Sequence, residues 1–156
     1  SSLFLLAACG FTPMYSAKHQ PALSVGFIID APKDEIGQQL HEELEDQLNP
    51  NGMPAQPAYN LAVTLISGVG GMGVARDGTV TRYNVTLISQ YVLTRSADKK
   101  VVERGEIRHV SSFNNQANQY FSTYISQKDS VKRGIGELGE LYRQRIGTLL
   151  LKDKLT

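Results

Sequence analysis

Cysteine, tryptophan and net charge are all scarce in this sequence. It contains one cysteine and no tryptophan, and its formal net charge is +1 over 156 residues. A single cysteine excludes an intramolecular disulfide, and a nearly neutral chain has no overall field that would select nucleic acid. No apolar run after residue 15 is long enough to cross the ~30 Å hydrocarbon core of a bilayer. The composition is otherwise that of an ordinary globular protein and predicts a single domain over residues 22–156.

Catalytic and metal-binding motifs are absent as well. The sequence has no His-Glu-x-x-His, Cys-x-x-Cys or Gly-x-Ser-x-Gly motif. His19, His41 and His109 lie far apart in the chain, without the spacing of metal ligands. The glycine run 68–73 lacks the Gly-Lys-Ser/Thr ending of a phosphate-binding loop. We therefore expect no enzyme activity, no metal and no cofactor.

The single cysteine lies in a distinctive setting, Leu6-Ala7-Ala8-Cys9-Gly10, directly after a short apolar run. This pattern is typical of the cleavage box of a bacterial lipoprotein signal peptide. It predicts that residues 1–8 are the remnant of a signal peptide and that Cys9 carries the lipid. The apolar start is too short to span a bilayer, whereas acyl chains add about 0.8 kcal/mol of membrane affinity per buried CH2. The alternative is a buried free cysteine near a frayed terminus.

The next segment, residues 9–21, is expected to be an extended tether because Pro13 and Pro21 disfavour a helix. A first strand is predicted over residues 23–29. Asp34 is the expected N-cap of a helix that ends at residues 49–52. Its apolar residues recur every four positions and form one stripe. They are Ile36, Leu40, Leu44 and Leu48.

Three more strands and a second helix follow. Alternating apolar residues predict strands over residues 59–65, 79–95 and 101–113, with Gly105 as a bulge in the last of these. The glycine-rich segment 67–78 is predicted to be a flexible connection, and the final helix to begin between residues 126 and 129. This order predicts an α+β fold, a two-layer sandwich with a four-stranded mixed sheet and two helices on one face. The crossover makes the first two strands parallel if they are neighbours.

Basic residues are concentrated on the two long strands and their turns. Arg82 shares the outward face of its strand with Thr86, and Arg104 and Arg108 share one face of theirs. Arginine binds phosphate through two parallel hydrogen bonds, so a common face would suit a ligand with several phosphates. The alternative is that these charges protect the open side of a sheet. The whole set is Arg76, Arg82, Arg95, Lys99, Lys100, Arg104 and Arg108.

The segment Cys9-Gly10-Phe11-Thr12-Pro13-Met14-Tyr15 resembles the mature start of the lipopolysaccharide-assembly lipoprotein family LptE. Many α-proteobacterial members have leucine where this chain has Met14. The expected order of strands and helices covers nearly the whole chain and is also similar to that family. So are the segment 81–85, which leads into the long strand, and Tyr124 ahead of the closing helix.

The resemblance implies a non-enzymatic lipoprotein, anchored through Cys9 at the periplasmic face of the outer membrane. It implies that the protein plugs and helps to assemble the β-barrel lipopolysaccharide translocon, of the LptD type, and binds lipopolysaccharide. From charge and strand parity we expect lipopolysaccharide phosphates at Arg82, Arg104 and Arg108, and at the hairpin residues Lys99 and Lys100. The alternative is another envelope lipoprotein, such as a pilotin or a lipid-transport accessory subunit, which co-purification would distinguish.

Overall fold

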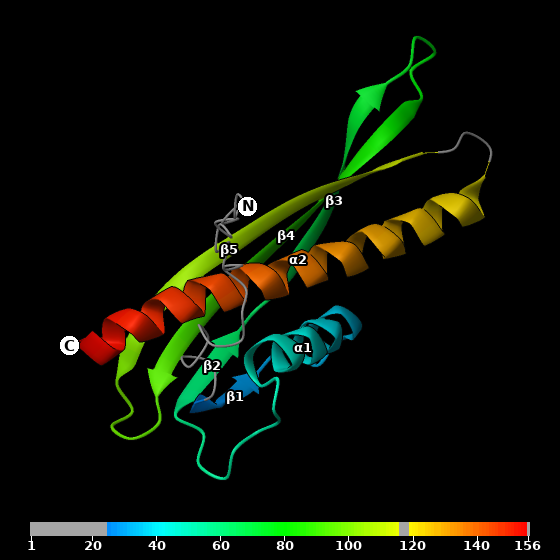
Figure 1. Cartoon of the computed structure of the whole chain (residues 1–156). Coiled ribbons are helices and arrows are strands. Elements are labelled where there is room, and N and C mark those ends of the chain that lie inside the picture. The colour runs from blue at the N-terminus through cyan, green and yellow to red at the C-terminus, as the bar shows by residue number, and fades with distance from the viewer. Residues whose placement is uncertain (1–24, 116–118, 156) are drawn as a thin grey trace, which may run out of the picture.

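The computed structural model describes residues 25–115 and 119–155. These residues form one five-stranded sheet with two helices on the same face (Figure 1). The two-layer α+β class is confirmed, but the predicted number of four strands is wrong, since a fifth lies in the middle of the chain. The predictions for the segments 1–8 and 9–21, including Cys9, lie outside the described residues.

The first unit of the fold is a parallel crossover, as predicted. Strand β1 (Phe27–Asp30) pairs in parallel with β2 (Tyr59–Val63), and helix α1 (Glu35–Leu48) connects them. Asp34 caps the helix because its carboxylate accepts a hydrogen bond of 3.0 Å from the Gly37 amide. At the other end, the buried Asn49 amide bonds both the backbone N–H and the C=O of Phe27, which ties the helix end to β1.

The glycine-rich segment is a strand and not the predicted flexible connection. Strand β3 (Ile66–Val74) pairs antiparallel with the first half of β4 (Val80–Arg95). Its four glycines carry no side chain that could alternate between two faces, so the sequence contains no period-2 signal there. The segment becomes a strand because it pairs with β4, although its own sequence shows no strand pattern. Together the two strands form a hairpin that projects beyond both helices (Figure 1).

Strand β4 is the centre of the sheet. One of its edges pairs with β5 (Val101–Asn114), and the other pairs first with β3 and then with β2. Odd-numbered residues of β4 face the helices, as the alternation predicted. The buried ones are Val85, Leu87, Ser89, Tyr91 and Leu93.

The predicted bulge at Gly105 is wrong. Gly105 lies in regular register opposite Tyr91, and the register shift falls instead between Leu93 and Thr94. The glycine has a packing role, because a Cβ atom at this position would lie 2.7 Å from the Tyr91 hydroxyl. The aromatic ring of Tyr91 therefore covers the backbone of β5 at this position.

Helix α2 (Tyr120–Leu155) begins earlier than predicted, and it lies along β4 and β5 beside α1 (Figure 1). Its early turns expose their aromatic residues, so the amphipathic pattern that marks a buried helix starts only later. No helix among the described residues combines the length and the hydrophobicity needed to cross a membrane. The buried residues of α2 are Ser130, Ile135, Leu138, Tyr142, Ile146 and Leu150.

A buried polar contact joins α2 to the sheet at the short segment between β2 and β3. The Tyr142 and Ser89 hydroxyls lie 2.6 Å apart, and Ser89 also donates to the carbonyl of Thr64 at 2.8 Å. Ser89 and Tyr142 are both fully buried. Burial raises the pKa of Tyr142, so its hydroxyl stays neutral and can take part in this contact.

Candidate ligand-binding face

The three predicted arginines lie on the face of the sheet opposite to the one that α1 and α2 cover. Arg104 is opposite Val92 and Arg108 is opposite Ile88, while Arg82 is opposite Asn114 at the other end of β4. Even-numbered residues of both strands point away from the helices, because the odd-numbered residues of β4 are buried beneath them. Strand register therefore places Arg82, Arg104 and Arg108 on one open face.

These arginines do not form one compact cluster. Arg104 and Arg108 are four residues apart on β5, which corresponds to roughly 13 Å along the strand. Arg82 is level with Asn114, roughly 20 Å beyond Arg108. Its guanidinium already donates to the Ser112 hydroxyl at 2.8 Å. The open face thus carries a pair of arginines on β5 and a third arginine at the base of the projecting hairpin.

A shallow depression lies beside Arg104 on the open face. Glu106 lies between the two arginines on the same face, and Gln90 donates to its carboxylate at 3.2 Å. Among the described residues, neither Arg104 nor Arg108 forms an ion pair. Their guanidinium groups are exposed and can meet an anion, with one carboxylate between them to limit the local positive charge. The depression is lined by Asp30, Ala62, Val63, Thr64, Gln90, Tyr91, Val92, Arg104, Gly105 and Glu106.

Lys99 and Lys100 lie in the turn between β4 and β5, at the end of the sheet far from Arg82. Lys99 has a φ of 58°, in the left-handed region, and the Lys100 amide donates to the Asp98 carboxylate at 3.1 Å. The register shift between Leu93 and Thr94 separates Lys100 from Arg104, and the Lys100 carbonyl accepts a hydrogen bond of 2.8 Å from the Arg95 amide. The two lysines therefore lie at the turn and do not share the strand parity of Arg104 and Arg108. Cys9, the predicted lipid attachment site, lies outside the described residues.

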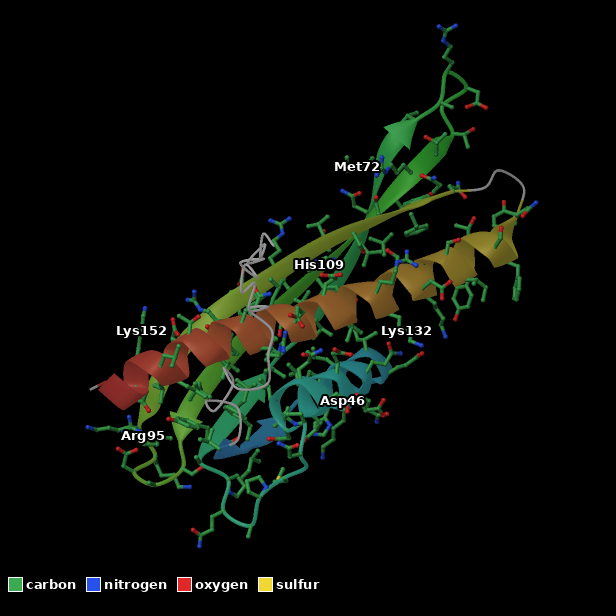
Figure 2. All side chains as sticks on the ribbon, viewed as in Figure 1. Asp46, Met72, Arg95, His109, Lys132 and Lys152 are labelled. Carbon is green, nitrogen blue, oxygen red and sulfur yellow. The ribbon has the colours of Figure 1, made fainter. Side chains whose placement is uncertain are left out.

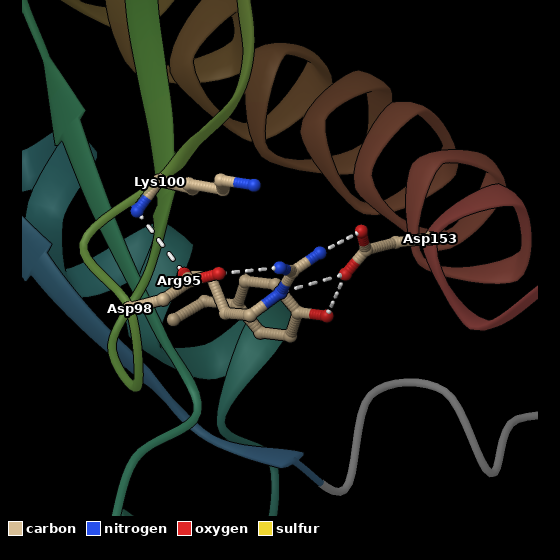
Figure 3. A network of polar contacts seen from close by, with 5 residues as sticks. Arg95, Asp98, Lys100 and Asp153 are labelled. Atoms are coloured by element: carbon tan, nitrogen blue, oxygen red, sulfur yellow. Dashed lines mark hydrogen bonds and ion pairs between the residues drawn. The ribbon is translucent and has the colours of Figure 1, made fainter. Parts of the chain in front are cut away.

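Arg95 belongs to a structural network and not to the open face (Figure 3). Its guanidinium pairs with Asp153 near the end of α2 and with Asp98 in the turn, the latter at 2.9 Å. Tyr59 on β2 donates to the same Asp153 carboxylate at 2.7 Å. The hydrogen bond from Tyr59, followed by that from Arg95, holds the pKa of Asp153 below its usual value. Burial and the Asp153 contact raise the pKa of Tyr59.

Sequence reasoning missed this network and an exposed aromatic patch at the start of α2. The network joins residues 58 and 94 positions apart, and no local pattern indicates such contacts. The patch did have a signal, the i, i+1, i+4, i+5 spacing of one helix face. Lys128 lies 5.3 Å above the ring of Tyr124 in this region. The exposed residues of the patch are Tyr120, Phe121, Tyr124 and Ile125.

The histidines do not come together. His41 lies on α1 with its ring 3.8 Å from Glu45, and His109 lies on β5 on the side facing α2 (Figure 2). His19 is outside the described residues. Over residues 25–115 and 119–155, no group of three or more histidine, cysteine or acidic side chains could hold a metal ion.

The described residues define a class, the two-layer α+β domain in which both helices lie on one side of the sheet. The family model LptE, described as lipopolysaccharide-assembly, matches residues 21–135. The chain therefore belongs to the LptE family of lipopolysaccharide-assembly proteins, as the resemblance predicted. A comparison with curated protein sequences finds no significant match.

Solved structures show the same fold at low sequence identity. The rare lipoprotein B of Shewanella oneidensis is 10% identical, with a TM-score of 0.66, over 82% of this chain and 98% of that one. A candidate lipoprotein of Caulobacter crescentus is 18% identical, with a TM-score of 0.65, over 85% and 95%. The minor lipoprotein of Acinetobacter baumannii is 13% identical, with a TM-score of 0.63, over 78% and 90%. At these identities the likeness establishes the fold.

Proposed function

We propose that this protein is a non-enzymatic outer-membrane lipoprotein that plugs and helps to assemble the β-barrel lipopolysaccharide translocon and contacts lipopolysaccharide during export. The observation that carries the proposal is the family match over residues 21–135. The five-stranded sheet with one open face supports it, because that face is available to a ligand or a partner. Anchoring through Cys9 belongs to the same proposal and rests on the sequence pattern at residues 6–10.

Phosphates of lipopolysaccharide would meet Arg104 and Arg108 on the open face. Each guanidinium offers a planar set of donors that matches two phosphate oxygens. The roughly 13 Å between the two residues favours a ligand with phosphates at more than one position. Lys99 and Lys100 would add charge at one end, and Arg82 would form a separate contact at the other end.

The first test compares two double variants with the same loss of charge. In the full chain, Arg104→Ala with Arg108→Ala removes the pair on the open face. Lys132→Ala with Arg133→Ala removes two exposed cations from α2. We expect the first to weaken binding to immobilised lipopolysaccharide by about tenfold or more, since each lost charged hydrogen bond is worth about 1.5–3 kcal/mol. We expect the second to bind like the wild type.

Dephosphorylated lipopolysaccharide provides the ligand control, because it should bind the wild type and the arginine variant equally. Equal losses in both double variants would mean that binding follows net charge and has no defined site. Unchanged binding by the arginine variant would remove Arg104 and Arg108 from the proposal. Arg82→Ala, measured alone, should cause a smaller loss, because this residue is distant from the pair and already bonded to Ser112.

A further inference from the structure

Among the described residues, no strand pairs with the outer edge of β3. Thr64 donates its amide to the Gln90 carbonyl at 2.9 Å, and the pairing of Ile66 with Ile88 continues the same register. Alternate residues of an antiparallel strand bond to the same neighbour, so the even-numbered residues of β3 bond to β4. The N–H and C=O groups of Ser67, Val69 and Gly71 therefore point outward. Within residues 25–115 and 119–155, no backbone hydrogen bond outside the β3–β4 pairing reaches these groups.

This edge continues the row that β1 occupies beside β2. Tyr59 donates its amide to the Gly26 carbonyl on that side of β2, and β1 pairs with β2 as far as Asp30. The chain then leaves the sheet to form α1, while β2 continues in register into β3. A strand added to β3 would thus extend the row of β1, along a segment that neither helix covers (Figure 1).

The other edges of the sheet are protected, whereas that of β3 is not. Edge strands commonly avoid pairing with other chains by being short or by carrying charge. Strand β1 has four residues and ends at Asp30, and β5 places Arg104, Glu106 and Arg108 along its length. Strand β3 has nine residues and no charge. Its apolar side chains Ile66 and Met72 are 61% and 65% exposed, and Met72 stands well clear of both helices in Figure 2.

We propose that β3 accepts an extended strand from another protein, hydrogen-bonded to Ser67, Val69 and Gly71, with bulky apolar side chains at alternate positions. Gly68 and Gly70 argue for bulky partners, because nothing lies within 4 Å of a Cβ built at either position. The same protein already places an aromatic ring over a glycine on a neighbouring strand, where Tyr91 covers Gly105. Aromatic side chains stabilise edge glycines in this way.

A second copy of this chain fits the edge less well. An antiparallel pairing of two β3 strands that satisfies all three outward residues sets Ser67 opposite Gly71 and Gly68 opposite Gly70. Glycine then faces glycine on the open side, so no side chain fills the space. A strand of different sequence can fill it, and the register shifts after Gly71 limit the addition to residues 66–71. The occupant is therefore a strand of another chain. This inference goes beyond the proposed function and is tested without lipopolysaccharide or the translocon.

The test uses the full chain and a synthetic peptide, Lys-Thr-Tyr-Thr-Tyr-Thr-Tyr-Thr-Lys, at about 1 mM, where weak binding is detectable. Amide hydrogen exchange is followed by NMR. We expect exchange at Ser67, Val69 and Gly71 to slow by about tenfold or more, since strand addition protects outward-facing amides. A control peptide with glycine in place of tyrosine should give no protection.

Proline substitution supplies the matched control. Val69→Pro removes an outward N–H from β3, and Val110→Pro does the same on the outer edge of β5. Both valines are 46% exposed, and proline is tolerated at such edge positions. The first should abolish protection of Ser67 and Gly71 by the peptide, and the second should leave it intact. If a proline variant fails to fold, Val69→Lys and Val110→Lys make the same comparison, because an edge lysine opposes strand addition.

Two results would overturn the proposal. One is unchanged exchange at all three amides with the tyrosine peptide. The other is protection that rises with protein concentration in the absence of peptide, accompanied by a dimer in sedimentation equilibrium, which would make the occupant a second copy.

Discussion

Single side chains decide how the far end of α2 is held to the sheet. The Asp153 carboxylate accepts hydrogen bonds from both Tyr59 and Arg95, and these contacts hold its pKa below the ordinary value. Only 12% of the Asp153 side chain is exposed, whereas 35% of Arg95 is exposed. Tyr59 and Arg95 both bond to the Asp153 carboxylate. Its negative charge therefore keeps these two side chains in place.

Asp153 should make stability fall at acid pH. Its pKa is lower in the folded chain than the roughly 3.9 of an unfolded aspartate, so the charged form stabilises the native state above that pH. The contribution is lost as pH falls through the folded-state pKa. We expect Asp153→Asn to lower the urea midpoint at pH 7 and to lose less stability than the wild type towards pH ~3.

The exposed Asp129 on the same helix offers the control for this experiment. Asp129→Asn should follow the wild-type pH dependence, because its carboxylate takes no part in the Tyr59 and Arg95 network. Identical acid sensitivity of the wild type and Asp153→Asn would show that other carboxylates control the transition.

At the level of elements, glycine has different roles on β3 and β5, the two strands that flank β4. On β5, Gly105 lets the Tyr91 ring lie against the backbone, and the Tyr91 hydroxyl accepts a 3.1 Å hydrogen bond from Arg145 on α2. On β3, Gly68 faces open space. The first glycine is required by packing inside the domain, and the second leaves a surface unfilled.

Alanine at these two glycines should therefore have different effects. Gly105→Ala places a methyl group against Tyr91, and overpacking of this kind costs about 1–3 kcal/mol of unfolding free energy. Gly68→Ala meets no atom and should be neutral or slightly stabilising, since alanine loses less backbone entropy than glycine. Denaturant unfolding measures both variants, and a Gly105→Ala protein as stable as the wild type would show that Tyr91 can move aside at no cost.

At the scale of the whole molecule, two surfaces with different properties lie on one domain. The open face carries exposed arginines, while the hairpin of β3 and β4 extends past the helices with exposed apolar side chains (Figure 1). A protein of the LptE family that contacts both a charged ligand and a protein partner would use separate surfaces for the two, because phosphate and apolar groups need different neighbours.

Affinity purification of the full-length lipoprotein from detergent-solubilised outer membranes tests the partner. We expect mass spectrometry to find the large β-barrel lipopolysaccharide translocon in stoichiometric amount. The Arg104→Ala, Arg108→Ala variant should still recover it, because those residues are proposed to contact lipopolysaccharide. Recovery of a secretin or a transporter complex would favour the alternative of a pilotin or a lipid-transport accessory subunit, and recovery of no partner would contradict the proposed function.

Prediction from sequence succeeded where the spacing of apolar residues itself determines which side of a helix or strand is buried. Leu40, Leu44 and Leu48 recur at helical spacing and are fully buried in α1, and the alternation of β4 gave the correct buried face. Prediction failed at β3, because its glycines have no side chains to alternate. It failed at the start of α2, where exposed aromatic residues replace the amphipathic stripe. The alternation of residues along each strand showed which arginines share a face. It did not show that Arg82 lies apart from Arg104 and Arg108, because that depends on how β4 and β5 are aligned.

The sequence by itself determined the α+β class, the parallel crossover through α1 and the family, because side-chain period, capping residues and the motif after Cys9 are local properties of the chain. Only the tertiary structure decided that β3 is a strand whose outer edge pairs with no other described strand, that Arg95 is bound to Asp153, and that Gly105 accommodates Tyr91. Each of these depends on contacts between distant segments, and such contacts follow from packing and strand pairing, not from the composition of either segment.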